Sequence, residues 1–169
     1  SIIQAAFAAQ GDLDPMFGDG GRVLLGLGGS HDFFNTVNVL PTGKLLVAGS
    51  GVGNRSVLLR LLSNGQVDPS YATGGVLVAP GSAFGAYSHA FNDGSAILAY
   101  YRTGADGLPG FAVSRISAEG VIDNAFGVAG LAFLPSNWSS RITGLEVDGS
   151  GNIYIIGQYL NGNHNDWLI

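Results

Sequence analysis

The sequence contains no cysteine, so neither disulfide bonds nor thiol chemistry can contribute to its structure or activity. Lys and Arg together number only 7 of 169 residues, against 12 Asp and Glu, and they are scattered singly. A nucleic-acid-binding surface needs clustered positive charge, so nucleic acid is not an expected partner. No apolar run reaches the roughly 18 residues of a membrane-spanning helix. We therefore expect no membrane span.

Glycine and apolar residues dominate instead. The chain has 28 glycines and is 46% hydrophobic but only 11% charged, which is typical of a folded protein with many tight turns. No helical period extends beyond a turn. Many turns without helices predict many short strands and an all-β fold.

One eleven-residue pattern occurs three times, beginning at Gly11, Gly65 and Gly120. Each copy holds a glycine, an aliphatic residue, an aspartate, an aromatic residue three positions later and a closing glycine. A period of about 55 residues indicates repeated supersecondary units.

Each repeat contains four apolar runs, separated by Gly, Asn, Asp or Pro. Four antiparallel strands per repeat favour β-propeller blades; a β-sandwich or a β-prism is the alternative. The third run of each repeat is almost continuously apolar, so we expect it to be covered on both faces. The predicted strands are 22–27, 34–40, 44–50 and 55–62; 76–79, 86–91, 95–101 and 111–117; and 131–134, 141–147, 152–158 and 166–169.

The register of the repeats predicts a single partial propeller domain over residues 1–169. Residues 1–10 align with the fourth run of a repeat and are expected to be the lone fourth strand of a neighbouring blade. The domain is thus divided into residues 1–10, repeat one at 11–64, repeat two at 65–119 and a truncated repeat three at 120–169.

Three repeats cannot close a propeller ring, and an open set leaves strand edges and apolar faces exposed to water. A second polypeptide carrying further blades could complete the ring. Alternatively, a second copy could close a six-bladed ring. In such a ring, residues 1–4 of one copy would compete with residues 166–169 of the other for the same strand positions. We therefore favour a second, different polypeptide.

The repeated residues resemble the bacterial delta-60 repeat. The resemblance lies in Gly11–Gly21, in Gly43–Gly49 and in the run Leu58–Leu62 that contains Arg60. The third repeat, through residues 148–157 and 166–168, is also similar to the seven-bladed propeller repeat of bacterial surface proteins. The resemblance implies a β-propeller, a secreted or cell-surface location in a bacterium, and a binding or structural role without assigned catalysis.

Asp14, Asp68 and Asp123 form the one acidic column that recurs in every repeat. A calcium loop would need several oxygen ligands at a different spacing. We therefore expect each carboxylate to cap its own tight turn by accepting backbone N–H groups. His31, His89 and His164 fall at unlike positions of their repeats, so no metal site and no cofactor is expected.

Aromatic residues in the variable loops are the best candidates for ligand contacts, because exposed aromatic faces bind sugars and apolar groups. Trp138 is the strongest candidate, since it is flanked by Asn137 and two serines. Tyr101 and Phe33 are weaker candidates, and packing between blades is the competing interpretation of each.

The sequence therefore favours a non-enzymatic module that binds a protein or a glycan through its blade loops. The alternative is a fragment of a propeller-type hydrolase or lyase whose channel site is completed by blades outside this chain. Non-repeated His, Asp or Glu residues on the innermost strands would favour the enzyme, but the sequence does not reveal which strand is innermost. No catalytic residue is predicted.

Overall fold

The computed structural model describes residues 11–29, 32–80, 85–104, 107–135, 140–161 and 164–168, with the backbone alone at 140, 159–161 and 164–168. All regular secondary structure in these residues is β-strand. The described part of the chain contains no helix of the length and apolarity needed to cross a membrane.

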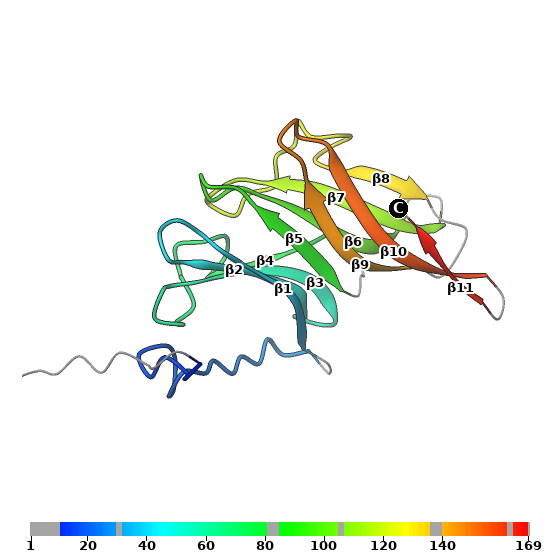
Figure 1. Ribbon diagram of the computed structural model, residues 1–169. Helices are drawn as coiled ribbons and strands as arrows, with labels where there is room; N and C mark the ends of the chain where they lie inside the picture. The colour runs from blue at the N-terminus through cyan, green and yellow to red at the C-terminus, as the bar shows by residue number, and fades with distance from the viewer. Residues whose placement is uncertain are drawn as a thin grey trace, which may run out of the picture.

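Eleven strands form three antiparallel sheets (Figure 1). Two sheets have four strands, in the orders β1-β2-β3-β4 and β5-β6-β7-β8, and the third has three, in the order β9-β10-β11. The strands are β1 (Phe33–Val39), β2 (Leu45–Gly51), β3 (Arg55–Leu61), β4 (Val76–Val78), β5 (Ala86–Ala90), β6 (Ala96–Thr103), β7 (Pro109–Ile116), β8 (Ala132–Pro135), β9 (Ser140–Val147), β10 (Ile153–Asn161) and β11 (His164–Leu168).

Each four-stranded sheet combines two sequence repeats. The fourth strand of the first sheet, β4, belongs to the second repeat in sequence, yet Leu77 pairs with Leu58 of β3. In the same way β8, from the third repeat, pairs with β7. The sheets are therefore offset from the sequence repeats by one strand.

The first predicted strand, residues 22–27, does not form a strand in the structure. Its side chains still alternate between exposed and half-buried, and Leu24 is 96% exposed. The space in which Gly51 would carry a Cβ is filled by the side chain of Leu27. The segment therefore lies against the first sheet in extended form, but no strand among the described residues pairs with it. Its counterparts β4 and β8 pair with the preceding repeat, whose equivalent here falls among residues 1–10, outside the described residues.

Strands β1, β5 and β9 are the innermost strands, because they contact one another in turn while each sheet extends outward from them. Figure 1 shows the three sheets side by side with β5 between β1 and β9. The arrangement is open, and its strand order within each sheet is that of propeller blades. The predicted fold class, a partial β-propeller, is confirmed.

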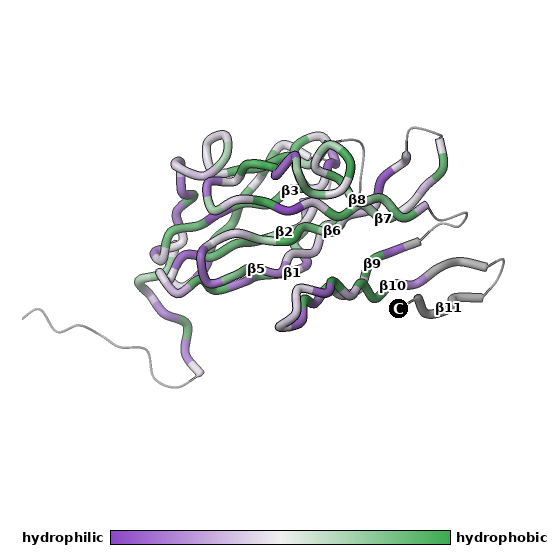
Figure 2. Tube along the Cα trace, turned by 90° about the horizontal axis from the view of Figure 1, so that it is seen from above, coloured by the Kyte–Doolittle hydropathy of each residue, from purple (hydrophilic) through white to green (hydrophobic). Residues whose placement is uncertain are grey.

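Two apolar layers fill the spaces between the sheets. The first joins sheets one and two and contains Leu46, Leu58 and Leu98, and the second joins sheets two and three and contains Phe111 and Ile142. In Figure 2, which colours the backbone by hydropathy, hydrophobic residues recur along the strands of the first two sheets. Residues 96–100 of β6 are all buried, as their continuous apolar sequence predicts, because alternate side chains enter the two layers.

Among the described residues, no other sheet covers the outer faces of the two terminal sheets. On β1, Val37 and Val39 are 64% and 74% exposed, and on β10, Tyr154 and Ile156 are 48% and 41% exposed. These residues occupy the strand positions that enter an apolar layer wherever a neighbouring sheet is present. Both ends of the stack therefore expose apolar side chains.

Candidate functional site

Three repeated turns, which we call the signature turns (residues 14–21, 68–75 and 123–130), share one side-chain contact. In each turn the aspartate accepts a hydrogen bond from the backbone N–H two residues later. The donors are Met16 N to Asp14 (2.9 Å), Ser70 N to Asp68 (3.1 Å) and Ala125 N to Asp123 (2.9 Å). This contact replaces a hydrogen bond that the tight turn denies to the backbone.

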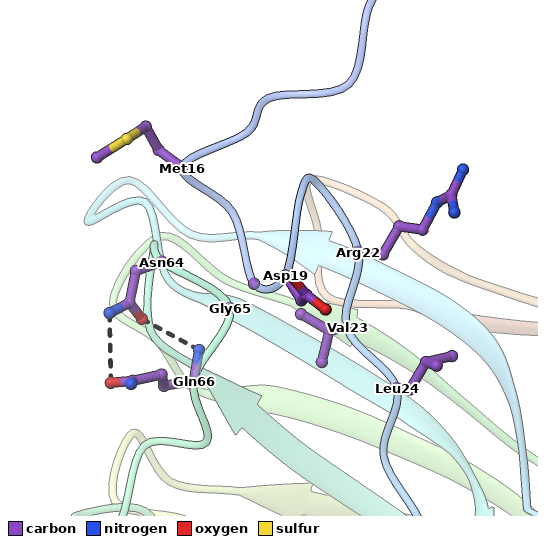
Figure 3. A pocket seen from close by; sticks show the side chains of 9 residues that line it. Met16, Asp19, Arg22, Val23, Leu24, Asn64, Gly65 and Gln66 are labelled. Carbon is purple, nitrogen blue, oxygen red and sulfur yellow. Dashed lines mark hydrogen bonds between the residues drawn. The ribbon is translucent and has the colours of Figure 1, made fainter. Parts of the chain in front are cut away.

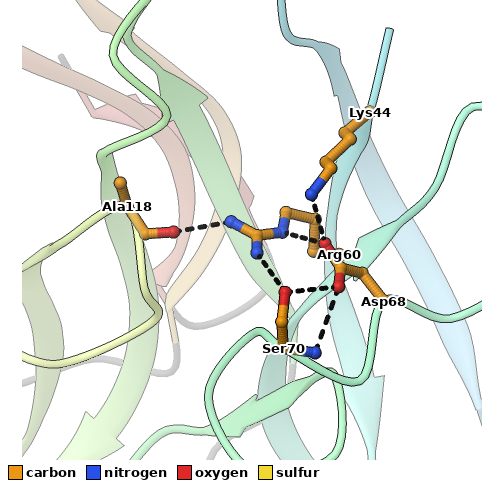
Figure 4. Close-up of polar contacts among 5 residues, drawn as sticks. All are labelled: Lys44, Arg60, Asp68, Ser70 and Ala118. Atoms are coloured by element: carbon orange, nitrogen blue, oxygen red, sulfur yellow. Dashed lines mark hydrogen bonds and ion pairs between the residues drawn. The ribbon is translucent and has the colours of Figure 1, made fainter. Parts of the chain in front are cut away.

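Asp68 is the buried member of the set, at 2% exposure. Its carboxylate accepts hydrogen bonds from Lys44 Nζ (2.8 Å), Arg60 Nε (2.8 Å) and Ser70 Oγ (2.6 Å), as Figure 4 shows. The hydrogen bonds from Lys44 and Ser70 hold the pKa of Asp68 well below its usual range, against the opposing effect of burial. The carboxylate is therefore ionised and fully engaged, with no free lone pair facing solvent for catalysis.

Arg60 connects this turn to the next sheet. Its Nη1 donates to the carbonyl oxygen of Ala118 (2.6 Å), which lies in the turn after β7 (Figure 4). The guanidinium also lies over the ring of Tyr71, 4.6 Å from the ring centre. Arg60 thus binds a carboxylate and an aromatic ring in the turn between β3 and β4 of the first sheet, and a carbonyl in the turn after β7 of the second sheet. The chemistry of this cluster is that of a structural link.

Two further turns, which we call the docking turns (62–65 and 117–120), pack against the first and the second signature turn, respectively. Gly18 N donates to Asn64 O (2.8 Å) in the first repeat, and Ala72 N donates to Glu119 O (2.7 Å) in the second. A Cβ at Gly120 would lie only 2.8 Å from Ala72 N, so glycine is required at this contact.

Each docked pair borders an open groove on the protein surface. The first groove, of about 650 Å³, lies between Met16, Leu24 and Gln66 (Figure 3). The second, of about 860 Å³, occupies the equivalent position between Thr73, Val78 and Asn124 in the next repeat. Within the described residues, we find in neither groove an arrangement of side chains suited to catalysis.

The innermost strands carry a polar contact that sequence reasoning missed. His89 Nδ1 on β5 lies 3.2 Å from Glu146 Oε2 on β9, and the His89 ring meets Phe91 edge to face at 5.3 Å. The equivalent position on β1 is Asn38, whose amide donates to Ser88 O (3.1 Å). Aligning the hairpins 40–44, 91–95 and 148–152 places these three residues in one column. That alignment is the signal that could have revealed the contact.

The predicted ligand-binding residues have different outcomes in the structure. Phe33 is 37% exposed at the start of β1. Tyr101 of β6 is half-buried, meets Phe111 edge to face at 6.5 Å, and packs against the second apolar layer. Phe33 and Tyr101 therefore lie in different sheets and are not brought together. Asn137 and Trp138 lie outside the described residues, as does His31, and His164 is described by its backbone alone.

The two ends of the sheets differ in how constant their connections are. At the signature-turn end, the three inner hairpins all have five residues, 40–44, 91–95 and 148–152. At the opposite end, which we call the variable end, the corresponding connections are 52–54, 104–108 and 162–163. Phe33 begins its strand at the variable end, where β8 also ends and β9 begins. Within the described residues, no group of three or more His, Asp or Glu side chains could hold a metal ion.

Comparison with known families supports the architecture. The sequence profile of a β-propeller family, described as a domain of unknown function (DUF5122), matches residues 40–71. This segment covers β2, β3 and the first part, residues 68–71, of the buried signature turn. Comparison with curated proteins and with solved structures gave no match. The chain therefore carries β-propeller repeats, and the matched family has no assigned function.

Proposed function

We propose that this chain is a non-enzymatic binding module of a secreted or cell-surface bacterial β-propeller protein, and that it recognises a glycan or a protein through the variable end. The observation that carries the proposal is the contrast between the two ends of the sheets. The signature-turn end repeats its connections, whereas the variable end changes them from sheet to sheet. Binding residues are commonly placed on variable loops held by a rigid scaffold.

The variable end also exposes apolar side chains from several connections. Four apolar side chains are between 38% and 59% exposed there: Phe34 in β1, Val52 and Leu108 in the connections after β2 and β6, and Leu134 near the end of β8. Val52 in addition has a φ of 31°, which is unusual for a β-branched residue. Strained backbone of this kind is concentrated at ligand-binding sites. Exposed apolar groups from several loops suit a sugar face or an apolar protein surface.

The proposal is tested by binding of the labelled chain to an array of bacterial and host glycans and purified extracellular proteins. A ligand found there is then titrated against Phe33→Ala and Trp138→Ala, and against Met16→Ala as the matched control at the signature-turn end, where Met16 is 77% exposed. We expect the first two variants to weaken binding about tenfold or more and the control to leave it unchanged. Loss of binding in Met16→Ala alone would place the site at the wrong end and refute the proposal.

A second candidate function, a hydrolase or lyase, is favoured by one observation. His89 and Glu146 are non-repeated titratable residues on two innermost strands and lie 3.2 Å apart. A histidine beside a carboxylate can act as a general base. The test is hydrolysis of a panel of glycosidic and ester substrates by the chain and by His89→Ala. Activity that disappears in the variant, while the fold is retained, would favour the enzyme over the binding module.

A further inference from the structure

We propose that the inner edge of β9 binds a primary carboxamide of an external ligand, in the way that the inner edge of β5 binds the side chain of Asn38. The inner edge is the edge of β5 that does not pair with β6, and the edge of β9 that does not pair with β10. The inference starts from two neighbouring contacts, that of β1 with β5 and that of β5 with β9 (Figure 1). It goes beyond the proposed function, because the site lies near the hairpin 148–152 and not at the variable end.

Side chains of β1 bind the inner edge of β5. Asn38 Nδ2 donates to Ser88 O (3.1 Å), and Asn38 Oδ1 accepts from Ala90 N (3.3 Å), so one carboxamide spans two backbone groups. Thr36 Oγ1 accepts from Ser88 N (3.1 Å). Polar side chains of the neighbouring sheet thus take the hydrogen-bonding positions that a further strand would otherwise take.

The inner edge of β9 presents the same backbone groups. The hairpins 91–95 and 148–152 both close with a hydrogen bond from the N–H of their first residue to the carbonyl of their last. Bonded and non-bonded pairs alternate along an antiparallel ladder, so the residues one and three positions before each hairpin direct their N–H and C=O groups away from the ladder. On β5 these are the two residues that Asn38 contacts, and on β9 they are Val147 and Leu145. The edge of β9 therefore offers the same acceptor and the same donor.

Strand β5 does not supply a matching side chain to β9. Its residue in the Asn38 column is His89, whose Nδ1 lies 3.2 Å from Glu146 Oε2. Within the described residues, no side chain donates to Leu145 O or accepts from Val147 N. The side chain that would do so comes from the preceding repeat, and the structure describes that position. The difference between the two edges is therefore independent of where the chain begins and ends.

The edge of β5 shows which chemical group fits. A primary carboxamide carries a donor and an acceptor on one planar unit, and Asn38 uses both. A carboxylate lacks the donor and an ammonium group lacks the acceptor, so neither can replace it. Tyr87 and Phe91 pack against the apolar layer that contains Leu145. Since aromatic side chains favour ring-bearing ligands, we expect the amide to be attached to a flat apolar group.

Hydrogen exchange of the folded 169-residue chain, followed by NMR, tests the difference between the two edges. The N–H of Ala90, which is bound by Asn38, should exchange about tenfold or more slowly than the N–H of Val147. His89→Asn places a carboxamide in the Asn38 column of β5 and should slow the exchange of Val147 by a similar factor. His89→Leu is the matched control, because leucine has nearly the shape of asparagine but no hydrogen-bonding group.

Binding is tested by titrating benzamide into the chain and following the same NMR spectra. We expect saturable shifts of the backbone amides of Glu146 and Val147, with a Kd of about 1 to 10 mM for so small a probe. N,N-dimethylbenzamide keeps the ring and the carbonyl but lacks the N–H donor, so it should bind about tenfold more weakly or less. His89→Asn should lose benzamide binding, because its own side chain occupies the edge, whereas His89→Leu should retain it.

Three results would overturn the proposal. The first is exchange of Val147 as slow as that of Ala90 in the wild-type chain, and the second is equal binding of the two benzamides. Both use the wild-type chain and do not depend on the folding of a variant. The third is benzamide binding that persists in His89→Asn, with circular dichroism as the check on folding. Because Phe33→Ala tests the variable end separately, failure here is distinguishable from failure of the proposed function.

Discussion

The second and third signature turns use the same residue types with very different results. In the second, the Arg60 and Asp68 side chains are 11% and 3% exposed, and in the third, Arg115 and Asp123 are 50% and 31% exposed. The difference comes from the docking turn at 117–120, which covers the second site and has no described counterpart over the third. One local motif therefore gives a buried network or a surface ion pair according to whether a distant segment packs against it.

The largest expected effect comes from breaking the buried network. Arg60→Ala leaves the Asp68 carboxylate buried with one fewer cation and removes the link to Ala118, so we expect a loss of about 3 to 5 kcal/mol in the free energy of unfolding. Arg115→Ala should cost much less, because solvent already screens its partner. Urea denaturation of both variants measures the difference. Equal losses would show that the two sites contribute alike and would contradict the comparison.

The next largest effect concerns the docking glycine. Gly120→Ala places a Cβ 2.8 Å from Ala72 N in a residue with a φ of 82°. We expect about 1 to 2 kcal/mol from the backbone conformation and a further 1 to 3 kcal/mol, roughly, from the collision. Gly107→Ala is the control, because Gly107 has a φ of 80° but nothing within 4 Å. Thermal or urea denaturation should show the smaller cost alone for Gly107→Ala, and similar costs for both variants would disprove docking at Gly120.

The comparison of the two turns also predicts that the free energy of unfolding depends on pH. Because the folded state lowers the pKa of Asp68, the unfolded state binds more protons at acid pH. The stabilisation by Asp68 is therefore complete above about pH 4, the ordinary carboxyl pKa, and is lost progressively as the pH falls below it. Asp68→Asn should be less stable than the wild type at pH 7 and approach it at pH 2 to 3, roughly.

Asp123→Asn is the control for this pH effect. The backbone N–H of Ala125 and the guanidinium of Arg115 also lower the pKa of Asp123, but its surroundings are exposed. We measure the free energy of unfolding of each variant by urea denaturation at several pH values. The pH dependence of Asp123→Asn should differ less from that of the wild type than the pH dependence of Asp68→Asn does. A larger departure from the wild type in Asp123→Asn than in Asp68→Asn would contradict this prediction, because the exposed aspartate would then contribute more to the pH dependence of stability than the buried one.

The smallest expected effect comes from making the second site resemble the third. Tyr71 is fully buried, and its hydroxyl has no hydrogen-bond partner within the described residues, whereas the third repeat has Phe126 at this position. Tyr71→Phe keeps the ring beneath Arg60 and removes only the hydroxyl. We expect a change within about 1 kcal/mol in either direction. A loss as large as that of Arg60→Ala would mean that the hydroxyl has an essential partner.

The sequence predicted the strands well because their signals are local. Alternating apolar residues and glycine-containing turns placed eleven of the twelve runs within about three residues of their observed bounds. It could not predict that β4 joins the sheet of the preceding repeat, because periodicity locates a strand without identifying its neighbour. The failure at residues 22–27 has the same cause, since Leu24 and its neighbours have the right pattern but no described partner strand.

The candidate site was less predictable than the fold. The recurrence of Asp68 indicated a turn, but its contact with Lys44 joins residues 24 positions apart, and the Arg60 bond to Ala118 spans 58 positions. Neither separation has a sequence signature. The contact between His89 and Glu146 depends on which strands are innermost, and that follows only from the packing of the sheets.

The offset between sheets and repeats has a consequence for how the protein unfolds. Because β4 belongs by sequence to the second repeat and by hydrogen bonding to the first sheet, neither sheet can detach as an independent unit. Opening the first sheet pulls on the strand that leads directly into the second, and the same holds for β8 and the third. Loss of structure should therefore spread across repeat boundaries as one cooperative event, unlike the sheet-by-sheet melting of domains connected by simple linkers.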